Sequence, residues 1–115
     1  MTQWEALMEL YDLCVHRGET LKRVLRFTKN KEVMDLTDWT AKSQVRTEPD
    51  GGDLICEIGV TIDAENGKMT LLVSDAVTTE FKSGVYAWDF RAADADGIAR
   101  YYLGGKFRVL RSVTE

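Results

Sequence analysis

Histidine, cysteine and proline are scarce in this chain, and long apolar runs are missing. The 115 residues include one histidine, two cysteines and one proline. A membrane-spanning helix needs about 20 consecutive apolar residues, and no stretch of the sequence comes near that length. The first twenty residues carry Glu5, Glu9 and Asp12 where a secretory signal would have a basic start. We therefore expect no membrane insertion and no export signal.

These scarcities leave little material for a metal centre or for catalysis. Cys14 and Cys56 are far apart in the sequence, and no Cys/His cluster has metal-ligand spacing. We predict no metal, no cofactor and two buried free thiols, with a disulfide between the two cysteines as the open alternative. His16 stands at the end of a strand-like run, just before Gly18, a position more typical of a surface residue than of a general base. The sequence thus predicts a protein that is not an enzyme.

Asp94 and Asp96 resemble a fragment of a calcium-binding loop. The EF-hand pattern would require a further acid at Ala92 and a bidentate Glu at Leu103, and both are absent. An acidic hairpin turn closed by Gly97 accounts for the segment without a ligand.

The net charge argues against nucleic acid as a partner. Fifteen basic residues against nineteen acidic ones give a formal charge of −4 and a pI near 5.0. A protein whose main task is to hold phosphate would be basic. The length is that of a single domain with one core.

Apolar and polar residues alternate through most of the chain, which is the period of a β-strand. The clearest alternating segments lie at 39–46, 69–73 and 85–91, and turn signals such as Asn66-Gly67 separate the segments. About eight short strands exceed what one small sheet holds. We therefore predict an all-β, immunoglobulin-like antiparallel β-sandwich, with a small barrel as the alternative.

Two segments break the alternation inside this domain. Residues 74–81 predict one short helical turn that Ser74 caps, with Val77 and Phe81 facing the core. Gly104-Gly105 interrupts the last strand, where a bulge or a bend toward the second sheet is expected.

The first ten residues have helical spacing instead. Trp4, Leu7 and Met8 form an apolar stripe, so we predict a short helix over residues 1–10 and a single sandwich domain over residues 11–115. The stripe could pack on the edge of its own sandwich or dock onto a neighbouring subunit.

Charge and aromatic residues suggest further contact surfaces. Residues 17–31 hold six basic side chains and one acidic one. Lys22 and Arg26 on the wet face of a strand could meet an acidic patch of a partner copy, or they could simply discourage edge pairing. One of Tyr101 and Tyr102 is expected to point outward. The candidate subunit contacts are Trp4, Leu7, Met8, Lys22, Arg26 and Tyr101.

The order of several segments resembles a known family. The segments are 11–20, 35–46 (DLTDWTAKSQVR), 67–71, 84–90 and 105–109. Together they are similar to small β-sandwich structural proteins of tailed bacteriophages and prophages, such as the N-terminal domain of baseplate upper proteins. The resemblance implies a virion or tail-associated structural role without catalytic residues, with itself and other tail or baseplate proteins as partners. It also implies a homo-oligomer, located in the bacterial cytoplasm during assembly and then in the virion. The alternative hypothesis is a non-catalytic binding module such as a carbohydrate-recognising sandwich.

Overall fold

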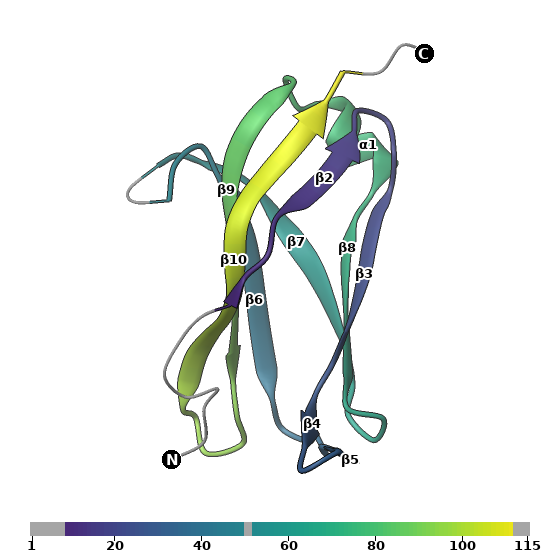
Figure 1. Cartoon of the computed structure of the whole chain (residues 1–115), viewed down its shortest axis with the longest axis vertical. Helices are drawn as coiled ribbons and strands as arrows, with labels where there is room; N and C mark the ends of the chain where they lie inside the picture. The colour runs from purple at the N-terminus through teal and green to yellow at the C-terminus, as the bar shows by residue number, and fades with distance from the viewer. Residues whose placement is uncertain (1–8, 50–51, 112–115) are drawn as a thin grey trace.

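The computed structural model describes residues 9–49 and 52–111, and most of this part of the chain forms β-strands (Figure 1). Its elements are β1 (Glu9–Leu10), β2 (Leu13–His16), β3 (Leu21–Arg26), β4 (Thr28–Lys29), β5 (Glu32–Val33), β6 (Thr40–Arg46), β7 (Leu54–Asp63), β8 (Lys68–Val73), α1 (Asp75–Thr79), β9 (Gly84–Ala93) and β10 (Ala99–Leu110). The predicted all-β fold is confirmed.

The strands form two layers because β7 takes part in both. The strand order is β1-β10-β9-β6-β7-β8-β3, and β2 also pairs with β10. Residues 54–58 of β7 pair with β6, whereas residues 59–63 pair with β8. The sheet therefore folds over along β7, and it brings β8 and β3 against the layer of β6, β9 and β10 (Figure 1).

The pairing departs from a purely antiparallel sandwich at one place. Both β1 and β2 run parallel to β10, while the other pairs are antiparallel. Parallel neighbours need a long connection, and almost the whole chain separates β2 from β10. In Figure 1 the two strands lie side by side, with β2 in purple and β10 in yellow.

The core lies between the two layers and follows the predicted alternation. On β6, Ser43 and Val45 are buried, and on β9, Trp88 and Phe90 are buried. The Ser43 hydroxyl donates a hydrogen bond to the carbonyl oxygen of Asp89 at 2.6 Å, which satisfies a polar group that the core would otherwise leave unpaired. The buried apolar residues are Leu13, Val15, Leu21, Leu36, Val45, Ile58, Met69, Leu71, Val73, Phe81, Trp88, Phe90, Ala92, Phe107 and Val109.

The predicted helical turn is present, but one of its two predicted core residues is not buried. Ser74 caps α1, since its hydroxyl accepts a hydrogen bond from the Val77 N–H at 3.3 Å, and Phe81 is buried. Val77 is exposed, and Thr78 is fully buried in its place. The Thr78 hydroxyl explains this choice because it donates to the Glu19 carbonyl at 2.8 Å and accepts from the Gly18 N–H at 3.1 Å. Helix α1 is thus fixed to the turn between β2 and β3.

The turns agree with the sequence at one hairpin and differ at another. The Asp94 carboxylate accepts from the Asp96 and Ile98 N–H groups, and Gly97 has a φ of 84°, so the hairpin turn is confirmed. At Asn66-Gly67 the loop is wider than the predicted two-residue turn, because Asp63 pairs with Lys68 and only Gly67 has a positive φ.

The glycine pair in β10 does not interrupt the strand. The irregularity in the β9–β10 register lies between Tyr101 and Leu103 instead. Gly105 is required for another reason. Its φ is 155°, and an added Cβ would lie 2.9 Å from the Tyr11 carbonyl oxygen. Glycine therefore lets the chain before β2 approach β10 closely.

The predicted N-terminal helix is only partly within the described residues. Glu9 and Leu10, its last two residues, form β1 and pair with β10. Edge pairing there satisfies backbone groups that a helix would satisfy locally. Trp4, Leu7 and Met8 lie outside the described residues.

Candidate binding groove

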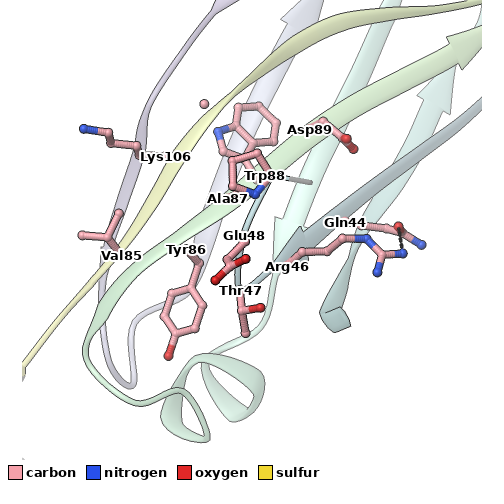
Figure 2. Close-up of a pocket in the computed structure, with 12 residues that line it drawn as sticks. Gln44, Arg46, Thr47, Glu48, Val85, Tyr86, Ala87, Trp88, Asp89 and Lys106 are labelled. Atoms are coloured by element: carbon pink, nitrogen blue, oxygen red, sulfur yellow. Dashed lines mark hydrogen bonds between the residues drawn. The ribbon is translucent and has the colours of Figure 1, made fainter. Parts of the chain in front are cut away.

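A groove lies on the outer face of the layer formed by β6, β9 and β10. Its volume is about 480 Å³, within the usual range for small-molecule sites. Figure 2 shows the side chains around it. The lining residues are Gln44, Arg46, Thr47, Glu48, Pro49, Val85, Tyr86, Ala87, Trp88, Asp89, Gly105 and Lys106.

Strand alternation and register assemble the groove. Trp88 and Phe90 face the core. Ala87, just before Trp88, and Asp89, between the two aromatic residues, therefore face outward. The β6–β9 register places Gln44 opposite Asp89 and Arg46 opposite Ala87. Polar side chains of β6 therefore lie beside a short apolar surface of β9.

Arg46 is held in place by two hydrogen bonds. Its Nη1 donates to the Gly52 carbonyl at 3.1 Å, and its Nη2 donates to Gln44 Oε1 at 3.0 Å (Figure 2, dashed line for the second). A guanidinium carries five N–H donors. The two bonds fix its orientation and leave further donors for a ligand.

Asp89 brings an incompletely compensated charge to the same surface. Partial burial raises the pKa of its carboxyl group, and the nearby Arg46 charge offsets part of that rise. Within residues 9–49 and 52–111, no base lies within 4 Å of its carboxylate. A partly desolvated carboxylate in a groove is typical of a binding site.

The predicted contact residues that the structure describes lie outside the groove. Lys22 and Arg26 are exposed on β3, as expected for a wet face, and Tyr101 is 54% exposed on β10. None of the three lines the groove. Sequence reasoning missed Arg46 and Asp89, whose only signal was an outward phase on an alternating strand.

The two cysteines are free, but they are not both buried. Cys14 is exposed on β2, whereas Cys56 on β7 is half-buried. The prediction was wrong for Cys14 because Leu13 and Val15 take the inward positions and turn the thiol outward. Burial raises the pKa of Cys56 to about 11.

Metal-ligating side chains do not gather in the described part of the chain. No group of three His, Cys, Asp or Glu residues there could hold a metal ion. Among the same residues, no helix has the length and apolarity to cross a membrane.

The comparisons with known proteins identify no family for this chain. No family model and no curated protein matches it. Among solved structures, the fold is similar to the crystal structure of CopC from Methylosinus trichosporium OB3b. That match has 18% identity and a TM-score of 0.45, and it covers 72% of this chain and 85% of that one.

This neighbour is not a phage protein, and the finding contradicts the predicted phage or prophage structural role. We therefore abandon that function. The likeness to CopC, at this TM-score, carries no argument about what this chain binds.

Proposed function

We propose that this protein is a non-catalytic binding module whose groove takes a small zwitterionic ligand, such as an amino acid or a short peptide. The observation that carries the proposal is the Asp89 carboxylate, partly buried and without an ion pair within the described residues, in the same groove as Arg46.

The two side chains favour opposite ligand charges. A ligand ammonium group beside Asp89 would compensate the partly desolvated carboxylate. A ligand carboxylate would accept hydrogen bonds from the remaining Arg46 donors, which suit the fork geometry of a carboxylate. The outward-facing Val85 and Ala87 provide an apolar surface for the ligand body.

Amide-resolved NMR titration tests the proposal with glycylglycine as the probe. Glycylglycine should shift the amide signals of residues 85–89. Its N-acetylated form, which lacks the ammonium group, should bind about tenfold more weakly, a loss of about 1.4 kcal/mol. Glucose serves as a neutral probe and should leave these signals unchanged.

Two variants assign the effect to the groove. Asp89→Asn should weaken glycylglycine binding about tenfold or more, because it removes the charged acceptor. Glu80→Gln removes one carboxylate from an exposed position outside the groove and should leave binding unchanged. The proposal is refuted if acetylation has no effect, if the two variants behave alike, or if glucose alone shifts the signals.

A further inference from the structure

Strand β3 is an unpaired edge of the second layer. It pairs with β8 on one side, and no other strand of the described residues pairs with it. Its six residues contain no proline, and its register with β8 has no bulge. A bulge-free edge of this kind is a template for another strand.

The backbone groups that face this edge can be identified. Just after β3, the Phe27 N–H donates to the Gly67 carbonyl at 2.7 Å, so Phe27 points toward the β8 side. The side to which the backbone N–H and C=O groups point alternates from residue to residue along an antiparallel strand. The backbone groups of Lys22, Val24 and Arg26 therefore point away from β8. Arg23 Nη1 donates to the Lys22 carbonyl at 2.9 Å, in agreement with a carbonyl that β8 does not use.

The side chains beside this edge are apolar in the middle and basic around it. Val24 on β3 and Leu72 on β8 are each 45% exposed on the outer face. Lys22 and Arg26 stand on either side of Val24, and Lys68 lies opposite Arg26. No carboxylate of the described residues lies within 4 Å of these three bases. This basic edge belongs to a chain with a net charge of −4.

The charges decide which strand could add here. A second copy pairing antiparallel about Val24 would place Lys22 of one copy opposite Arg26 of the other, and like charges in opposite positions destabilise a sheet. An acidic segment would instead meet a base on either side of an apolar contact.

We propose that β3 docks an extended acidic segment of a partner protein, which adds as a new strand along Lys22, Val24 and Arg26. The added strand would carry the pattern acidic-x-apolar-x-acidic, since alternate side chains share one face. This surface belongs to a different layer from the groove, so the inference does not depend on the proposed ligand.

Fluorescence anisotropy with a labelled peptide, Ser-Glu-Thr-Val-Thr-Glu-Ser, tests this inference. The peptide should bind the full chain, and rising salt should weaken the binding. Replacing its two Glu by Lys should abolish binding. Hydrogen exchange should slow at the amides of Lys22, Val24 and Arg26 when the peptide is present, because a ladder would protect them.

Variants separate strand addition from simple charge attraction. Val24→Pro removes an edge N–H and should cost binding about tenfold or more, while proline is tolerated on an edge strand. The double variant Lys22→Glu with Arg26→Glu should no longer bind the acidic peptide, and this result tests the inference even if the proline variant does not fold. Lys82→Glu, an exposed charge reversal beyond α1, is the matched control and should bind normally.

Several results would overturn the inference. They are no binding of the acidic peptide at millimolar concentration, equal binding by Lys22→Glu/Arg26→Glu, unprotected edge amides in the complex, and full binding by a folded Val24→Pro. Efficient competition by a single-stranded DNA oligonucleotide would also overturn it, because it would show a general anion site.

Discussion

Removing the indole of Trp88 should cost more stability than most single substitutions in this chain. The side chain is 4% exposed at the centre of β9, and its Nε1 donates a hydrogen bond to the Tyr11 carbonyl at 2.8 Å. Replacing a buried Trp by Ala typically costs about 3–5 kcal/mol. This hydrogen bond is partly buried, so the loss of the donor adds to the cost of the lost volume.

Urea unfolding followed by circular dichroism measures the loss. Trp88→Ala should lower the free energy of unfolding by about 3–5 kcal/mol and the melting temperature by roughly 10–25 °C. Trp88→Phe keeps an aromatic ring in the core and should cost about 1–2 kcal/mol, which keeps the test informative if the alanine variant does not fold.

Thr40→Ala is the matched control for this prediction. Thr40 is exposed at the start of β6, where substitution should change stability by no more than roughly 0.5 kcal/mol. If Trp88→Ala costs no more than Thr40→Ala, the inward phase of β9 is wrong. If Trp88→Phe and Trp88→Ala cost the same, the core volume that we assign to the indole is wrong.

Three further predictions concern the polar groups. Thr78→Val should cost about 1–3 kcal/mol in urea unfolding, because the Gly18 N–H and the Glu19 carbonyl lose their hydroxyl partner, and equal loss for the exposed Thr79→Val would contradict this. At pH 8 a thiol reagent should modify Cys14 well before Cys56, whose raised pKa of about 11 leaves almost no thiolate; a rate unchanged in Cys14→Ser would refute the order. Folding raises the pKa of Asp89, so its contribution to stability is full below the unfolded pKa and is lost as pH rises through the folded pKa. At pH 7, Asp89→Asn should therefore unfold at a higher urea concentration than the wild type. A lower urea midpoint for the variant would contradict this direction.

Local patterns predicted the strands well because they depend on neighbouring residues. The outward and inward phases of β6 and β9 follow directly from alternation, and the Asp94 turn and the Ser74 cap use side chains that bond to backbone groups two to four residues away. Thr78 shows the limit of this reasoning. Its burial depends on a turn some 60 residues earlier in the chain, and the helical spacing within residues 74–81 cannot indicate that partner.

The groove depends on register between distant strands, which is why the sequence did not reveal it. Gln44 and Arg46 lie beside Asp89 only because β6 pairs with β9, and their sequence separation hides the juxtaposition. Partial burial of Asp89 is likewise a property of the assembled layer. The predicted self-association stays a prediction, which light scattering on the full chain and on a chain without residues 1–9 can check.

The parallel pairing of β1 and β2 with β10 has a consequence for how the protein folds. The Lys106 N–H donates to the Asp12 carboxylate across a sequence separation of 94 residues, and the neighbouring strands meet over similar spans. Contacts between residues so far apart in the sequence form late, because closing a long loop costs entropy before any contact compensates for it. During synthesis, β2 must wait for β10 to leave the ribosome before it finds its neighbour. A nascent chain halted before Phe107 would leave that early strand without a partner, and we expect chaperones to bind it there.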